Sequence, residues 1–282
     1  MFLRFLAVTV LTAAAAVAPV GVRPAAAIAN GTDGAYPFAV LLVMSGLPTA
    51  EHGTRDSSCS GALIAPEWVI TAGHCFRDVG GRRVSRTVAD RTTAVVGRSD
   101  LGGTEGWERE VVDVRQAGDA DVALARLDAD VPGGTPLVVG TAPPTVGETV
   151  RLAGYGLTIR DGAYAPATRL QTGQFAVDRV GDSVLEISGR VPGPDTSACE
   201  HDSGGPYFRE RPDGVAVLVG VVSTGPSCPH PGADIGARTD NLSGWIEDTV
   251  RGGGVPFGRL ALGGLVVLAV LVGAHRVRAG RR

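Results

Sequence analysis

The chain has 282 residues, enough for one large or two small packed domains. Its 26 basic and 29 acidic side chains leave a formal charge of -3, so no basic surface favours nucleic acid as a partner. All of the basic residues other than histidine are arginine, a bias that suggests a GC-rich genome.

Residues 1–27 predict a signal peptide. Arg4 is followed by an apolar run and then by small residues, and Ala25, Ala26 and Ala27 form an A-x-A cleavage site. A retained membrane anchor is the alternative, which the cleavage site disfavours. We therefore expect the protein to be exported.

Residues 28–251 predict a β-rich extracytoplasmic domain. Clusters of Gly, Pro and Asp separate short valine-rich runs, which lie at 38–44, 93–97, 149–156 and 215–223. Helical periodicity is confined to residues 242–250. A Pro- and Gly-rich stretch, 131–148, predicts a connector between two halves, about 28–140 and 146–251. Many short strands with turn signals are typical of barrels or a sandwich.

The C-terminal 31 residues predict a membrane anchor in three parts. A linker at 252–259 begins with three glycines, residues 260–274 carry no charged or polar side chain, and residues 275–282 form a basic tail. The apolar run reaches the roughly 20 residues of a span if it is counted from Val255, and the positive-inside rule places the tail in the cytoplasm. A buried helix of the domain is the alternative, which the glycine linker disfavours.

Four cysteines suggest two disulfide bonds in an oxidising compartment. They are Cys59, Cys75, Cys199 and Cys228, and their spacing alone permits three pairings. The spacing C-x-x-C is absent, so we expect no metal site, and we expect no cofactor.

Three side chains fit acyl transfer by serine. This chemistry needs a hydroxyl, a base within hydrogen-bond reach and a group that orients the base. The candidates are Ser203 in "DSGGP", His74 in "VITAGHC" and Asp121 in "DVALARL". Asp119 is a weaker choice for the acid, because Ala120 separates it from the apolar run.

Taken together, these segments resemble the trypsin-like (chymotrypsin-fold) serine peptidases, and with the genome bias they suggest a bacterial member. The resemblance covers residues 28–251 and depends on "IANG", "YPFAV", "CSGALIAPEWVITAGHC", "DVALARL", "ACEHDSGGP", "VVSTG" and "WIEDTV". The His, Asp and Ser candidates follow the chain order of the family. The implied fold is all-β, with two six-stranded antiparallel β-barrels, a short C-terminal helix and then the transmembrane helix.

The resemblance also assigns roles. Ser203 would attack the scissile carbonyl, His74 would act as the general base, and Asp121 would orient His74 with the support of Ser223. The backbone N–H groups of His201 and Ser203 would form the oxyanion hole. The implied disulfides are Cys59–Cys75 and Cys199–Cys228.

The family pattern further implies an ion pair between a new N-terminal amine and the acid before the nucleophile. Here the partners would be Ile28 and Asp202. Signal-peptide cleavage after Ala27 would itself expose Ile28, so we expect an enzyme that is active on secretion. A short propeptide, left by cleavage a few residues away, is the alternative.

Three positions depart from the family pattern. His201 stands where a glycine is usual, and histidine is among the residues that tolerate positive φ.

The specificity pocket would have Ser197 at its base and Gly225 at its mouth. Counting back from "WI" places Asp234 on its wall, whereas counting forward from Cys228 places Gly232 there. We lean towards a pocket for neutral side chains. Thr224 replaces a tryptophan that usually lines the cleft.

These residues predict a membrane-tethered extracytoplasmic serine endopeptidase that acts as a monomer on peptides or proteins. A catalytically impaired homologue that only binds is the alternative, because His201 could distort the oxyanion hole. An esterase is disfavoured, since the Gly-x-Ser-x-Gly elbow is absent.

Overall fold

The computed structural model of the protein describes residues 28–160 and 163–252. The predicted signal peptide, the predicted membrane span and the basic tail lie outside these ranges. Within the described ranges, no helix is long and apolar enough to cross a membrane.

The first barrel closes in the strand order β2-β3-β4-β7-β6-β5. Its strands are β2 (Ala39–Pro48), β3 (Thr54–Ala65), β4 (Trp68–Thr71), β5 (Arg91–Val96), β6 (Trp107–Gln116) and β7 (Ala123–Leu127). Strand β2 illustrates why the barrel forms: Val40, Leu42 and Met44 alternate along the strand and are buried in the core. Between β4 and β5 lies a single turn of 3-10 helix, η1 (Gly73–Cys75).

The second barrel is the antiparallel ring β9-β12-β13-β16-β15-β14, in which β14 also pairs with β9. Its strands are β9 (Thr149–Gly154), β12 (Gln171–Val180), β13 (Val184–Val191), β14 (Pro206–Glu210), β15 (Ala216–Thr224) and β16 (Ala233–Arg238). Two short strands extend the sheet: β1 (Thr32–Asp33) pairs with β12, and β8 (Val138–Val139) runs parallel to β15. The predicted pair of six-stranded barrels is therefore confirmed.

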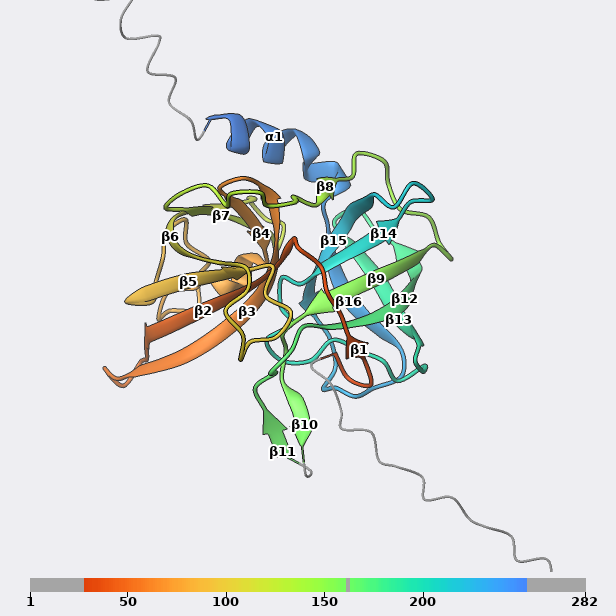
Figure 1. Ribbon diagram of the computed structural model, residues 1–282, viewed down its shortest axis with the longest axis horizontal. Coiled ribbons are helices and arrows are strands. Elements are labelled where there is room, and N and C mark those ends of the chain that lie inside the picture. The colour runs from red at the N-terminus through yellow and green to blue at the C-terminus, as the bar shows by residue number, and fades with distance from the viewer. Residues whose placement is uncertain (1–27, 161–162, 253–282) are drawn as a thin grey trace, which may run out of the picture.

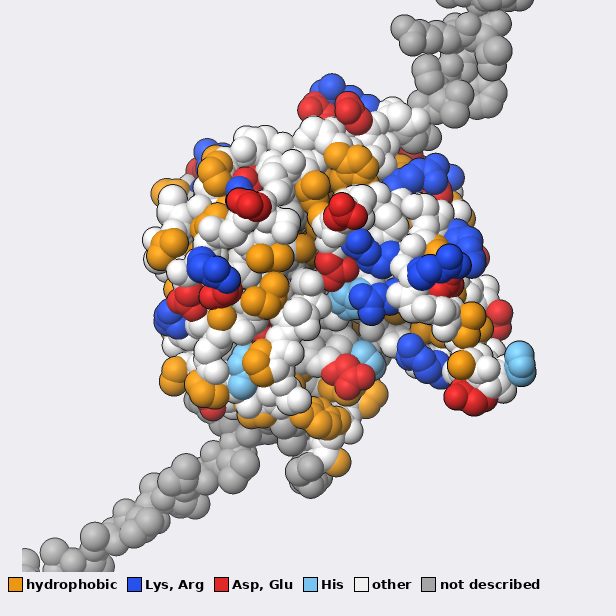
Figure 2. Space-filling view, turned by 180° about the vertical axis from the view of Figure 1, so that it is seen from behind, with side chains coloured by type: hydrophobic (Ala, Val, Ile, Leu, Met, Phe, Trp, Pro, Cys, Tyr) orange, Lys and Arg blue, Asp and Glu red, His pale blue; other side chains and the backbone are white. Residues whose placement is uncertain are grey.

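The remaining elements lie outside the barrels (Figure 1). Strands β10 (Thr158–Arg160) and β11 (Ala163–Ala165) form a hairpin that projects from the body of the molecule. A second 3-10 turn, η2 (Asp240–Leu242), leads into helix α1 (Ser243–Gly252), the predicted C-terminal helix. Ile246 is the buried residue of this helix, and it belongs to the same core cluster as the first-barrel strands. The face seen in Figure 2 mixes acidic and basic side chains without a continuous basic area.

Aromatic rings join the two barrels. Phe38, just before β2, packs edge to face against Phe208 of β14 with ring centroids 5.1 Å apart. Tyr36 contacts both rings, at 5.4 Å and 5.0 Å. Phe208 is fully buried, so this cluster fixes one barrel against the other and thereby sets the width of the cleft between them.

We expect Phe208→Ala to lower the free energy of unfolding by about 3–5 kcal/mol, because it leaves a cavity between the barrels. Urea denaturation measures the change. Val138→Ala is the matched control, since Val138 is half exposed, and it should change stability by no more than about 0.5 kcal/mol. Equal effects of the two substitutions would contradict the role given to the aromatic cluster.

Candidate active site

His74 and Asp121 are brought together by two paired strands. His74 lies in η1, directly after β4, and Asp121 lies just before β7, which pairs with β4 through Thr71 and Ala123. The Nδ1 atom of His74 is 2.8 Å from Oδ2 of Asp121, and the backbone N–H of His74 donates to Oδ1 at 2.8 Å. The carboxylate therefore fixes both the ring and the backbone of the histidine.

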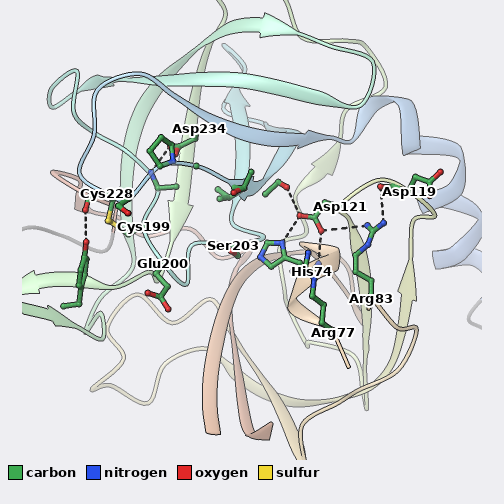
Figure 3. A pocket seen from close by; sticks show the side chains of 18 residues that line it. His74, Arg77, Arg83, Asp119, Asp121, Cys199, Glu200, Ser203, Cys228 and Asp234 are labelled. Carbon is green, nitrogen blue, oxygen red and sulfur yellow. Dashed lines mark hydrogen bonds and ion pairs between the residues drawn. A yellow bond between two sulfur atoms is a disulfide. The ribbon is translucent and has the colours of Figure 1, made fainter. Parts of the chain in front are cut away.

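The second barrel contributes two serines to the same place. The hydroxyl of Ser223, on β15, donates to Oδ2 of Asp121 at 2.7 Å. Ser203 precedes β14, and its carbonyl accepts the N–H of Ser60 of the first barrel at 2.9 Å. Ser203, His74 and Asp121 line one cavity of about 790 Å³ (Figure 3).

Gly204 permits this close approach of Ser203 to the first barrel. Its φ of 82° belongs to the left-handed region that favours glycine. A Cβ atom at this position would lie 2.0 Å from Oγ1 of Thr71 and 2.5 Å from the backbone N of Ala72. Any side chain would therefore push the serine loop away from the segment that leads into His74.

The Asp121 carboxylate is held in its charged form. Burial acts to raise its pKa, but the hydrogen bond and charge of His74, the hydroxyl of Ser223 and the His74 backbone N–H together act more strongly in the opposite direction. The net effect lowers the pKa of Asp121 to about 2. The carboxylate is thus ionised throughout the neutral pH range and stabilises positive charge on the adjacent imidazole.

His201 has a positive φ, in the left-handed region that favours glycine. Its φ is 76°, and the N–H of Asp202 donates to the carbonyl of Cys199 at 3.0 Å, which closes a four-residue turn. Positive φ at the third position of such a turn is the type II geometry. The expectation that histidine could take this conformation is confirmed.

The side chain of His201 spans towards the first barrel. Its Nδ1 lies 3.0 Å from the hydroxyl of Ser58 on β3, while its carbonyl accepts the hydroxyl of Ser60 at 3.1 Å. Burial lowers the pKa of His201, with Glu200 opposing that shift and Arg55 reinforcing it. These contacts offset the backbone strain of a non-glycine residue, which is of the order of 1–3 kcal/mol.

Both disulfides have the pairing that the resemblance implied. Cys59–Cys75 ties β3 to η1, and Cys199–Cys228 ties the serine loop to the segment before β16. Both bonds therefore anchor segments that line the cavity. In the described part of the chain, no cluster of three His, Cys, Asp or Glu side chains could hold a metal ion.

The structure places the expected pocket residues in two different environments. Gly225 and Asp234 line the cavity, and a Cβ on Gly225 would lie 2.3 Å from Oδ1 of Asp234. Ser197 is fully buried, and its hydroxyl accepts the N–H of His230 at 3.3 Å. Of the two residues that the sequence placed on the pocket wall, Asp234 lines the cavity and Gly232 does not.

Asp234 has a partner that the sequence did not reveal. Its Oδ1 lies 3.1 Å from Nε2 of His230, and its Oδ2 accepts the N–H of Ala198 at 2.9 Å. Burial raises the pKa of Asp234, although the hydrogen bonds from Ala198 and His230 and the charge of His230 act against that shift. The hydroxyl of Tyr207 lies 3.5 Å from the same carboxylate.

Asp202 lies in the interior of the protein. Its carboxylate is fully buried and accepts N–H groups from Cys199 and Gly156, at 2.9 Å and 2.8 Å. Ile28 is fully buried in the second barrel, and the N–H of Ala29 donates to the carbonyl of Ser197 at 2.9 Å. Burial raises the pKa of Asp202 to about 8, although the two backbone hydrogen bonds oppose that shift.

Two further cavity residues had no recognisable signal in the sequence. Tyr164 of β11 is 55% exposed at the cavity, and its hydroxyl donates to the carbonyl of Cys228 at 3.0 Å. Arg83 comes from the loop between η1 and β5 and reaches the segment before Asp121. Tyr164 and Arg83 both bond to backbone carbonyls, which every residue has, so no sequence pattern marks these contacts.

The comparisons with known proteins agree with this geometry. A family model described as "Trypsin" matches residues 28–246, and the chain therefore belongs to the trypsin family. It is similar to serine protease 56 of Mus musculus, with 27% identity over 248 residues, which cover 78% of this chain and 38% of the mouse protein. Chymotrypsin-like elastase family member 3B of Homo sapiens is 28% identical over 275 residues, covering 89% and 99% of the two chains.

A bacterial protein is among the relatives. A trypsin-like protease of Streptomyces glaucescens is 29% identical over 210 residues, which cover 67% of this chain and 75% of that protein. The relatives thus come from mammals and from a bacterium, and the bacterial origin of this chain stays a prediction. The chain spans only 38% of the length of the mouse relative.

When no free amine at Ile28 is present to pair with Asp202, for example after chemical blocking, we expect the free energy of unfolding to fall as pH rises from 5 to 8. The folded-state pKa of Asp202, about 8, exceeds the unfolded value near 3.9, so the folded state binds one more proton in this range. The free energy of unfolding should therefore decrease by about 1 kcal/mol per pH unit. Urea titrations of Asp202→Asn, which cannot titrate, supply the control. An identical slope in both proteins would contradict this account.

Proposed function

We propose that the protein is a serine endopeptidase that hydrolyses peptide bonds through an acyl-enzyme, with Ser203, His74 and Asp121 as its triad. The observation that carries the proposal is the hydrogen-bonded chain from Ser223 through Asp121 to His74, with Ser203 in the same cavity. Membership of the trypsin family supports the same reaction.

The geometry supports a specific division of labour. The Oγ of Ser203 forms a bond to the scissile carbonyl carbon while His74 takes its proton. The C–N bond then breaks as His74 gives that proton to the leaving amine, and water repeats the sequence to release the acid. Asp121, whose pKa is lowered to about 2 by its hydrogen bonds, remains charged and stabilises the imidazolium that forms in each step.

The backbone N–H groups of His201 and Ser203 are proposed to bind the oxyanion. The positive φ of His201 supports this role, because it keeps the turn in the geometry that glycine would adopt. A backbone donor does not depend on the side chain, so histidine need not impair the hole. The positive φ of His201 therefore supports an active enzyme over an impaired, binding-only homologue.

The pocket is proposed to hold the side chain that precedes the cut. Asp234 and Gly225 line the cavity whereas Ser197 is fully buried, which supports contact of this side chain with a carboxylate rather than with the serine. The contact of Asp234 with His230 offsets part of its charge, which supports acceptance of neutral as well as basic side chains. A peptide panel that varies this position checks the assignment, and an absolute preference for acidic side chains would contradict it.

Activity is proposed to require a free Ile28 amine paired with Asp202. The burial of both residues and the Ala29–Ser197 hydrogen bond support this pair. Because Asp202 is unpaired in charge otherwise, an ammonium beside it would stabilise its carboxylate. Sequencing of the secreted protein should find Ile28 first, and another first residue in the active form would exclude the idea.

Export and membrane tethering are proposed from the sequence at the two ends of the chain. The two disulfide bonds support an oxidising compartment. Residues 260–274 and the basic tail would anchor the domain with the tail in the cytoplasm. Membrane fractionation of the full chain against a form that ends at residue 251 tests the anchor, and recovery of both in the soluble fraction would contradict it.

A serine-directed phosphonate probe tests the enzymatic proposal. The probe should label Ser203 of the 28–251 fragment, and Ser203→Ala should abolish labelling. His74→Ala should slow labelling by at least about a thousandfold, because the hydroxyl loses its base. A peptide library incubated with the fragment and with Ser203→Ala then identifies cuts that depend on the serine. Folded fragment that neither reacts nor cuts would support a binding function instead.

His201→Gly tests the oxyanion hole. Because His201 already has the glycine conformation, we expect kcat/KM to change by less than about threefold. A gain of about a hundredfold or more would instead mean that the natural hole lacks a donor. His201→Ala is the control, since it removes the Ser58 contact and keeps a Cβ atom at positive φ.

A further inference from the structure

Arg83 lies against the segment that carries the proposed catalytic acid. Its guanidinium donates to three consecutive carbonyl groups directly before Asp121: those of Gly118 at 2.9 Å, Asp119 at 3.1 Å and Ala120. Its Nη1 also lies 3.9 Å from Oδ1 of Asp121. Figure 3 shows the Arg83 head between Asp119 and Asp121, on the side of the Asp121 carboxylate away from Ser203.

The surrounding residues make room for this guanidinium. Gly73, the residue before His74, has no side chain, and a Cβ there would lie 3.0 Å from Nη1 of Arg83 and 2.6 Å from Oε1 of Gln116. The amide of Gln116 donates to the carbonyls of Gly73 and Val84, at 3.0 Å and 3.2 Å. Gln116 thus links the two segments that flank the guanidinium, and the Arg83 side chain is only 24% exposed.

We propose that Arg83 is a positioning residue for the Asp121–His74 pair, a role that rests on the proposed function. Its planar, five-donor head fixes the 118–120 backbone in one conformation, which a point charge on a flexible stem would do less well. A carboxylate held within a fraction of an ångström keeps the imidazole aligned for proton transfer.

The other charged groups near the Asp121–His74 pair are unchanged when Arg83 alone is replaced. Arg77, which follows η1, and Asp119, before β7, line the same end of the cavity, and Ser223 of β15 is the neutral contact from the second barrel. Glu200 and Asp234 line the cavity beside the specificity pocket. Substitution of Arg83 alone therefore isolates its contribution.

The test measures kcat and KM for Arg83→Met, Arg83→Lys and Gly73→Ala in the active protein. Arg83→Met should lower kcat about tenfold with little change in KM, because the carboxylate is less well placed. Arg83→Lys should also lower kcat, since lysine retains the charge but loses the planar fork that holds the three carbonyl groups.

Gly73→Ala and chemical rescue give independent readings. The added methyl group should displace the guanidinium and reproduce the effects of Arg83→Met in part. Added guanidinium ion should restore part of the kcat of Arg83→Ala, whereas it should not raise that of the wild type. Arg86→Met is the matched control, because Arg86 is an exposed arginine of the same loop and donates to the neighbouring carbonyl of Thr87.

A cooperatively folded Arg83→Met protein with the kcat and KM of the wild type would overturn the proposal. If that variant does not fold, unchanged kcat in both Gly73→Ala and Arg83→Lys would overturn it. A wild-type protein that neither reacts with the phosphonate nor cuts peptides would instead reject the proposed function, and the role of Arg83 with it.

Discussion

The architecture of the site depends on one carboxylate that accepts hydrogen bonds from both barrels. The Asp121 carboxylate is hydrogen-bonded to the ring and the backbone N–H of His74 in the first barrel. It also accepts a hydrogen bond from the hydroxyl of Ser223 in the second barrel. Each barrel closes on its own, so neither needs the other for its backbone hydrogen bonds. The shared acceptor thus turns two independent barrels into a cavity with a defined arrangement of functional groups.

The contact between the barrels is tight enough to exclude a single methyl group. Gly204 lies so close to Thr71 that a Cβ atom on it would clash with the threonine side chain. The carbonyl of the neighbouring Ser203 accepts the N–H of Ser60 on β3. The aromatic cluster of Tyr36, Phe38 and Phe208 also packs one barrel against the other. Packing far from the chemistry therefore controls the separation between the histidine and the serine, which come from different barrels.

Much of the fold could be predicted because the valine-rich runs and the segments around His74, Asp121 and Ser203 are continuous in sequence. The position of Asp234 depended on an ambiguous count through a loop of unusual length, so the sequence alone could not decide whether this carboxylate lines the cavity. Arg83 gave no signal, since its partners are backbone carbonyls that leave no pattern in the sequence. His201 was the reverse case, because a known tolerance for positive φ predicted its backbone correctly.

The burial of Ile28 has a practical consequence for the study of this protein. The chain contains no lysine, so a form that begins at Ile28 would carry its only primary amine inside the second barrel. Amine-reactive reagents would then find no target on the native surface. The rate at which they react would report how often the second barrel opens, in the manner of hydrogen exchange but at a single covalent position.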